Sequence, residues 1–229
     1  ISGSGTVFFT GCNLRCVFCQ NYEISHLNRG QEIPVSELVR IFMNLQEEEG
    51  CHNINLVSPT HQIAAIAVAI ELAKKQGLYI PIVYNSGGYD SVATLRQIEG
   101  LVDIYMPDMK YADSTAAKLY SDATDYPQVN AEAVREMQRQ VGDLKIVDAV
   151  AVKGLLIRHL VLPDGIAGSV PVINFIKAQI SLKAAINIMD QYHPCGDIDN
   201  LVALQKKPRK FEIDYLITYT KEKGLRIVN

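Results

Sequence analysis

The chain has 229 residues, 48% of them hydrophobic, with no tryptophan and a formal net charge of −3. This length can bury the core of one large α/β domain or of two small ones. The mildly acidic balance gives no electrostatic reason to expect a nucleic-acid partner or an anionic membrane as partner. The longest apolar run, residues 63–70, is too short to cross a bilayer.

Short apolar runs predict six strands that alternate with helices. The strands are expected at residues 6–10, 53–57, 80–84, 102–106, 155–162 and 184–189. The helices are expected from Pro34 to the Glu47–Gly50 run and at residues 62–75, 91–98, 131–141, 170–180 and 211–223. The stretch 111–143 is longer than a simple crossover, so it is expected to contain an extra turn or helix.

Alternation of strand and helix predicts right-handed crossovers and a parallel sheet. Six units are fewer than the eight of a closed barrel, which leaves a partial (β/α)6 barrel and an open doubly wound sheet as the two candidates. No stretch rich in Pro, Gly or Ser divides the chain. We therefore expect a single domain over residues 1–229.

Cysteine usage points to a reducing compartment. The chain has five cysteines, an odd number, and Cys51 and Cys195 lie far from the other three. A secreted disulfide scaffold would show an even, dispersed set, so we expect a cytoplasmic protein. Because the chain begins with Ile rather than Met, we also expect that the natural N-terminus is missing.

The other three cysteines, Cys12, Cys16 and Cys19, follow the first predicted strand in the pattern C-x3-C-x2-C. Thiolates this close repel one another and oxidise easily, and a soft metal neutralises their charge. Structural zinc prefers four ligands, commonly as two spaced pairs, and no second pair is present here. Three close cysteines suit an iron–sulfur cluster with one iron open to another ligand.

Polar residues follow each of the other predicted strands, where parallel α/β folds bind ligands. They are Ser58–His61, Asn85–Gly88, Asp108 and Lys110, Asp164, and Tyr192 and His193. Structural alternatives remain: His61 as a helix cap, Asp108 with Lys110 as a surface ion pair, and His193 as a structural histidine. Arg158 and His159 alternate on one strand, so one faces inward and one outward, and the sequence leaves open which.

The cysteine motif resembles the signature of the radical S-adenosylmethionine (SAM) enzymes. The stretches GCNLRCVFCQN, NLVSPTH and LIRHLVLP are similar to the branch that contains the pyruvate formate-lyase activating enzyme and its uncharacterised relatives. The resemblance implies a partial (β/α)6 barrel and a [4Fe–4S] cluster on Cys12, Cys16 and Cys19. It also implies SAM on the open iron and reductive cleavage of SAM to a 5′-deoxyadenosyl radical that abstracts hydrogen.

The resemblance further implies that several residues hold SAM. These are Asn21, Ser58, Thr60, Asn85, Ser86, Asp108, Lys110, Arg158 and His193, with His193 and Lys110 also expected to be catalytic. The family's Gly-Gly-Glu-Pro-like turn is replaced here by Ser58–His61, which weakens the assignment of Ser58 and Thr60. An electron donor such as flavodoxin or ferredoxin is the implied partner.

Three functional hypotheses follow from the sequence. The leading one is a radical SAM enzyme that activates a glycyl-radical protein. The second is a radical SAM enzyme that acts on a small molecule. The third is a non-catalytic module in which zinc or an iron–sulfur cluster only staples the loop.

Overall fold

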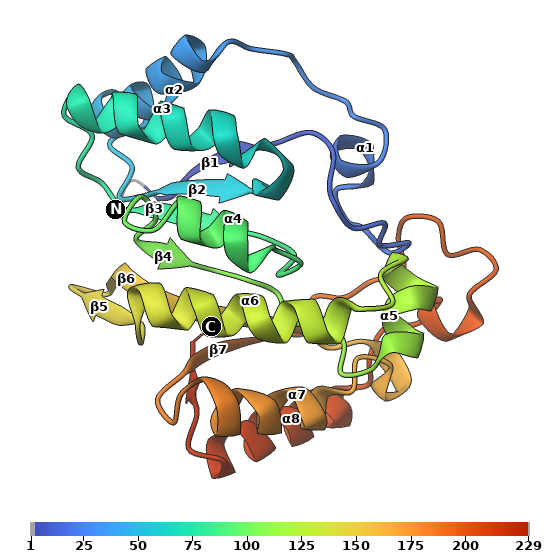
Figure 1. Cartoon of the computed structure of the whole chain (residues 1–229). Helices are drawn as coiled ribbons and strands as arrows, with labels where there is room; N and C mark the ends of the chain where they lie inside the picture. The colour runs from blue at the N-terminus through green and yellow to red at the C-terminus, as the bar shows by residue number, and fades with distance from the viewer. Residues whose placement is uncertain (1–2, 229) are drawn as a thin grey trace.

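The computed structural model describes residues 3–228, which form one mostly parallel sheet with helices on its outer side (Figure 1). The strands are β1 (Gly5–Phe8), β2 (Ile54–Val57), β3 (Ile82–Asn85), β4 (Ile104–Tyr105), β5 (Lys145–Val147), β6 (Val150–Leu160), β7 (Ala185–Met189) and β8 (Arg226–Ile227). Their order is β1-β2-β3-β4-β6-β7-β8, and β5 pairs with β6 alone, antiparallel.

The α-helices are α1 (Tyr22–Ser25), α2 (Val35–Glu47), α3 (Ile63–Lys75), α4 (Val92–Gln97), α5 (Ser114–Ser121), α6 (Tyr126–Val141), α7 (Ser169–Phe175) and α8 (Lys210–Glu222). A π-helical turn, Ile176–Ile180, extends α7, and short 3-10 turns occupy Thr60–Gln62, Pro163–Gly165 and Val202–Leu204. The strand order follows the chain without the reversal of a doubly wound sheet, and with the parallel pairing it confirms the partial barrel.

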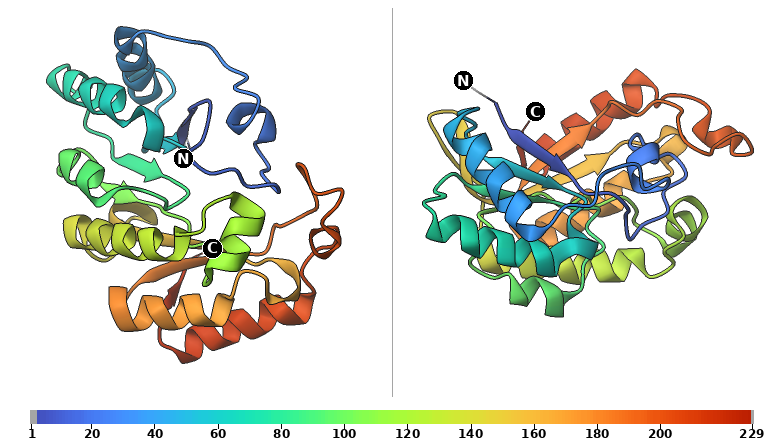
Figure 2. Two further views of the ribbon diagram at one scale, coloured as in Figure 1. Left: turned by 45° about the vertical axis from the view of Figure 1, so that its right-hand side comes forward. Right: turned by 90° about the horizontal axis from the view of Figure 1, so that it is seen from above.

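The helices that connect successive strands form an arc around the sheet, from α2 and α3 at one end to α7 and α8 at the other (Figures 1 and 2). One core packs β1–β3 against α2 and α3, and includes Phe42, Ile54 and Ile70. A larger core packs the remaining strands against α4, α6, α7 and α8. The inner face of the sheet is closed near the strand starts by Val83, Ile104, Leu144 and Ala185. The opposite end of the barrel is therefore the one left for a ligand.

All six predicted strands are present, and the long stretch after β4 does contain an additional helix, α5. Asp113 begins α5 because its carboxylate accepts hydrogen bonds from the backbone N–H groups of Thr115 and Ala116. The prediction for α6 was five residues too short, since that helix begins at Tyr126 rather than at residue 131. Pro127 lies in its first turn, where the missing N–H costs nothing.

Two parts of the sheet were not predicted. Strand β6 begins at Val150 and forms a hairpin with β5 through Asp148 and Ala149, both of which have positive φ. That is the conformation of a type I′ turn, but the sequence lacks the Asn-Gly or Asp-Gly pair that signals one. Strand β8 has only two residues. Within residues 3–228, no helix has both the length and the apolar character that crossing a bilayer requires. The expectation of one domain over residues 1–229 stays a prediction.

Candidate cofactor cavity

A cavity of about 400 Å³ lies at the carboxyl ends of the strands, within the size range of small-molecule sites. All three cysteines of the C-x3-C-x2-C motif line it, from the loop that follows β1. Apolar walls come from Phe8, Leu14, Phe18, Val57, Leu160 and Met189. Polar walls come from side chains at the ends of β2, β3, β4, β6 and β7. Residues far apart in the chain therefore converge on one cavity.

The cysteine loop is fixed by its backbone. The N–H of Arg15 donates to the carbonyl of Ser121 at 3.1 Å, and the N–H of Val17 donates to that of Tyr120 at 3.0 Å, so the end of α5 supports the loop. From the other side, a side chain at Gly196 would overlap the Val17 carbonyl, and Gly196 has φ +76°. A glycine is needed there because the loop after β7 passes directly against the cysteine loop.

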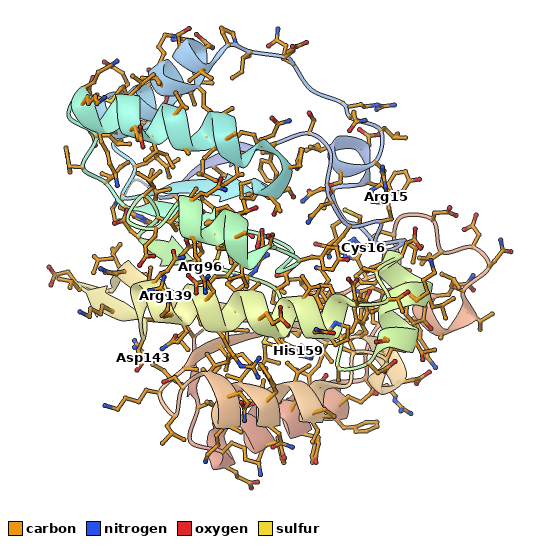
Figure 3. All side chains as sticks on the ribbon, viewed as in Figure 1. Arg15, Cys16, Arg96, Arg139, Asp143 and His159 are labelled. Atoms are coloured by element: carbon orange, nitrogen blue, oxygen red, sulfur yellow. The ribbon has the colours of Figure 1, made fainter. Side chains whose placement is uncertain are left out.

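Of the three thiols, Cys16 is buried, and Cys12 and Cys19 are partly exposed. Burial raises the pKa of Cys12, and it raises the pKa of Cys16 to about 11. The Ser121 hydroxyl donates to the Cys16 sulfur at 3.0 Å, and the Leu14 N–H donates to the Cys12 sulfur at 3.4 Å. Figure 3 shows Cys16 beside α5. A bound cation offsets the cost of ionising such buried thiols, which suits a metal-binding loop.

The arrangement of ligands does not match a preformed mononuclear site. Among residues 3–228, no three histidine, cysteine, aspartate or glutamate side chains converge closely enough to hold a single metal ion. A tetrahedral zinc site requires such convergence. All three thiols line one cavity, and cysteine thiolates are the usual ligands of iron–sulfur clusters.

Opposite the cysteines, the Asp108 carboxylate forms ion pairs with two basic side chains. Lys110 Nζ lies 2.6 Å from Asp108 Oδ2, and the Arg158 guanidinium lies 2.7 Å from Oδ1. Burial opposes ionisation of Asp108, but Arg158 and Lys110 outweigh burial and lower the pKa of its carboxyl. Burial would likewise lower the pKa of Lys110, yet the Asp108 carboxylate raises it above its ordinary value. All three side chains are therefore charged near neutral pH, and the group carries one net positive charge.

The turn after β3 is held against β4 by side chains from α6. Asn130 Nδ2 donates to the carbonyls of Gly88 and Asp108, at 2.9 and 2.8 Å. The Tyr126 hydroxyl lies 2.9 Å from the Gly87 carbonyl and accepts the Lys110 N–H at 3.0 Å. Gly88 has φ +72°, and a Cβ there would overlap both Asp108 and Asn130. Helix α6 thus fixes two walls of the cavity at once.

The turn after β2 is unusual in its backbone. Ser58 has φ +55°, a left-handed conformation that non-glycine residues seldom adopt. Its N–H donates to the Asn85 carbonyl at 3.0 Å, which joins this turn to the one after β3. The next hydroxyl along the chain, that of Thr60, donates to Asp90 Oδ1 at 2.7 Å.

The comparison with known families decides the class of protein. The model of the radical SAM superfamily matches residues 6–155, which include the three clustered cysteines and strands β1 to β4. This chain belongs to the radical SAM superfamily.

Relatives of this radical SAM chain are distant. An uncharacterised protein of Methanocaldococcus jannaschii is 28% identical over 201 residues, which cover 83% of this chain and 54% of that protein. The pyruvate formate-lyase-activating enzyme of Clostridium pasteurianum is 25% identical over 162 residues, covering 69% of this chain and 61% of that enzyme. The chain thus spans a little over half the length of these two relatives.

Solved structures share its fold. Methylornithine synthase superposes with a TM-score of 0.66 at 13% identity, covering 98% of this chain and 64% of that one. SuiB of Streptococcus suis bound to SAM superposes with a TM-score of 0.66 at 11% identity, covering 99% of this chain and 49% of that one. At such low identity the likeness concerns the fold alone.

Most residues expected to hold SAM line the cavity of this superfamily member. They are Asn21, Ser58, Asn85, Ser86, Asp108, Lys110 and Arg158. Of the pair left open by the sequence, Arg158 faces inward. His159 faces outward and is fully buried, with Nδ1 donating to the Met109 carbonyl at 2.6 Å. Asp108 and Lys110 form a mostly buried ion pair rather than a surface one.

Two expected residues do not line the cavity, Thr60 and His193. Thr60 lies behind the cavity wall, where its hydroxyl meets Asp90. The ring of His193 is exposed, and Nδ1 lies 3.3 Å from the Gln191 carbonyl, so its expected role with SAM stays a prediction. The neighbouring Tyr192 turns inward instead, packs against Phe18 and donates to the Leu204 carbonyl at 2.7 Å. His61 caps no helix, and its Nε2 lies 2.6 Å from the Thr10 carbonyl.

Sequence reasoning missed Asp90, Ser121, Tyr126 and Asn130. None of them stands directly at a strand end or in a motif with a recognised spacing, so a single sequence gives no signal for Ser121, Tyr126 or Asn130. Asp90 follows the Asn85–Gly88 turn by two residues, which was the one available hint.

Proposed function

We propose that this chain binds a [4Fe–4S] cluster through Cys12, Cys16 and Cys19, and SAM in the adjoining part of the cavity. Together the cluster and SAM supply reductive cleavage of SAM to methionine and a 5′-deoxyadenosyl radical, which abstracts hydrogen from a substrate. The observation that carries the proposal is the convergence of the three thiols with Asp108, Lys110 and Arg158 on one cavity. Membership of the radical SAM superfamily supports the choice of cluster and cofactor.

The roles of the chain's own residues follow from their charge and position. Lys110 is a fixed cation between Asp108 and the cysteine loop, so it favours negative charge on the thiolates and on a carboxylate ligand. Because its pKa is raised, Lys110 does not act as a general base. Leu14, Phe18 and Leu160 exclude water from the same space, which protects a reactive radical.

We propose activation of a glycyl-radical protein as the leading activity within this class. The match to a pyruvate formate-lyase-activating enzyme supports it. A small-molecule substrate is the second candidate, because membership of the superfamily does not by itself distinguish a protein substrate from a small one. An electron donor of the flavodoxin or ferredoxin kind is the proposed partner in either case.

The test is anaerobic reconstitution of the protein with iron and sulfide. The wild type should become brown and, with dithionite and SAM, release 5′-deoxyadenosine. Cys16→Ala should release none, whereas Cys51→Ala, which changes a cysteine buried in the β1–β3 core, should reconstitute and cleave SAM. One zinc per chain without sulfide, or no cleavage by the fully reconstituted wild type, would contradict the proposal.

A further inference from the structure

Asp90 is a buried carboxylate to which neither the cysteine motif nor the proposed function gives a role. Its residue is only 2% exposed, in the loop between β3 and α4. Three hydroxyls donate to it: Thr60 to Oδ1 at 2.7 Å, Tyr84 to Oδ1 at 2.8 Å and Ser86 to Oδ2 at 2.7 Å. No lysine or arginine is among its hydrogen-bond partners within residues 3–228. A buried carboxylate needs such donors because desolvation is costly.

The two oxygens of Asp90 connect two turns that come from different strands. Oδ1 holds Thr60, two residues after Ser58 in the turn that follows β2. Oδ2 holds Ser86, which directly follows β3 and whose hydroxyl also accepts the Gly88 N–H at 3.1 Å. The Ser58 N–H to Asn85 carbonyl bond also links these turns, and the Tyr84 hydroxyl lies 3.4 Å from the Thr60 hydroxyl. Asp90 therefore fixes the spacing of the cavity walls at Ser58 and Asn85.

This geometry also reassigns two residues that the family resemblance placed on the cofactor. The hydroxyls of Thr60 and Ser86 both point to the Asp90 carboxylate, and Ser86 is 2% exposed. Neither hydroxyl is available to donate to a ligand while that bond persists. Ser58, Asn85 and Ser86 line the cavity from these turns, and Asp90 supports them from behind.

We propose that Asp90 is a positioning residue for SAM, acting through the hydroxyls of Thr60 and Ser86 on the two turns that follow β2 and β3. The inference rests on the proposed function, because it assumes that SAM occupies this cavity. A carboxylate suits the task since both oxygens accept only, which forces the hydroxyl hydrogens toward Asp90. An amide at this position would present an N–H2 group to one of the hydroxyls and loosen one turn.

The experiment measures SAM binding to the reconstituted protein by equilibrium dialysis, and thermal unfolding of the same samples. Asp90→Asn and Thr60→Val should each weaken SAM binding roughly tenfold, as loss of a supporting partner behind a ligand commonly does. Thr60→Ser keeps the hydroxyl and should bind SAM within about twofold of wild type. Cluster content, read as iron and sulfide per chain, should stay at the wild-type value in all three.

Tyr105→Phe is the matched control for stability. This substitution also deletes a tyrosine hydroxyl from the core, on the strand next to that of Tyr84. The Tyr105 hydroxyl donates to Gln140 at 2.7 Å and not to Asp90. It should unfold at a lower temperature and bind SAM as the wild type does.

If Asp90→Asn and Thr60→Val lose stability but bind SAM normally, Asp90 is only structural and the inference is wrong. Should Asp90→Asn fail to fold, the comparison of Thr60→Val with Thr60→Ser decides. A wild type that does not bind SAM overturns the proposed function as well, whereas normal binding by wild type and variants overturns only the role of Asp90.

Discussion

Ser58 is a cavity-lining residue with a strained backbone conformation. At φ +55° its Cβ crowds the following carbonyl, which costs about 1–2 kcal/mol for an L-residue. Glycine adopts this conformation without strain but loses more freedom on folding, so the gain is partly offset. Ser58→Gly should therefore raise the free energy of unfolding by about 0.5–1 kcal/mol, measured by urea denaturation of the reduced, cofactor-free protein.

Ser91→Gly is the control for that prediction. Ser91 precedes α4 with φ −73° and makes no capping hydrogen bond through its side chain, so glycine relieves no strain there. We expect Ser91→Gly to lower stability by a few tenths of a kcal/mol. Equal effects of the two substitutions would mean that the conformation of Ser58 stores no strain.

At the scale of one element, α6 both supports the cavity and packs on the sheet. At its far end the helix is tied to α4 through Glu136, whose carboxylate binds Arg139 at 2.7 Å, accepts from Gln140 at 2.9 Å and lies 3.7 Å from Arg96. Figure 3 shows Arg96 and Arg139 together where α4 meets α6. Hydrogen bonding to Arg139 is the main reason that the pKa of Glu136 falls from 4.5 to about 2.

Glu136→Gln should lower the free energy of unfolding at pH 7 by about 2 kcal/mol, because charge-assisted hydrogen bonds are lost and Arg96 is left without its partner. A depressed pKa contributes stability above about pH 4.5 that disappears as the pH falls toward 2. The gap between wild type and Glu136→Gln should therefore narrow from pH 5 to pH 2.5 in denaturant titrations. Glu132→Gln, on an exposed face of the same helix, should match the wild type at every pH.

Elements and site differ in how far the sequence predicts them. Strands such as Ile54–Val57 are short, mostly apolar runs bounded by polar residues, and that pattern identifies them without tertiary information. The start of α6 and the β5–β6 hairpin depend on Pro127 and on two residues with positive φ, which act through backbone geometry that composition does not reveal. The cysteines were identified by spacing, but Asp90 and Asn130 reach the cavity wall only through packing between distant segments.

At the scale of the whole molecule, the barrel has a seam between β4 and β6. Strand β4 is two residues long and pairs with β6 only at Ile104–Gly154 and Tyr105–Leu155. Beyond these pairs the seam continues through polar groups, since the Met109 N–H donates to the Arg158 carbonyl at 2.8 Å and His159 binds the Met109 carbonyl. Arg158 and His159 therefore serve the same seam from opposite faces, one toward the cavity and one toward α7.

The seam makes the fold sensitive to acid through His159. Its Nδ1–H donates to Met109, and its Nε2 lies 2.8 Å from the Ser169 hydroxyl. Burial lowers the pKa of this histidine below 6.5 and outweighs the hydrogen bond to Met109 and the charge of Asp108, which both raise it. The unfolded chain takes up a proton near pH 6.5 that the folded chain resists. The contribution of neutral His159 to the free energy of unfolding is thus fully present above that pH. At lower pH the free energy of unfolding decreases by at most about 1.4 kcal/mol per pH unit.

His159→Gln should abolish this loss of stability in acid, because glutamine can donate to Met109 and accept from Ser169 without titrating. Denaturant midpoints of the wild type should fall between pH 7.5 and 5.5, and those of His159→Gln should fall much less. His26→Gln is the matched control: burial and Arg15 also lower the pKa of His26, but that ring is only partly buried, stacked on Tyr22, and it bridges no strands. If His159→Gln keeps the wild-type pH dependence while His26→Gln loses it, acid acts on the cysteine loop and α1 rather than on the seam.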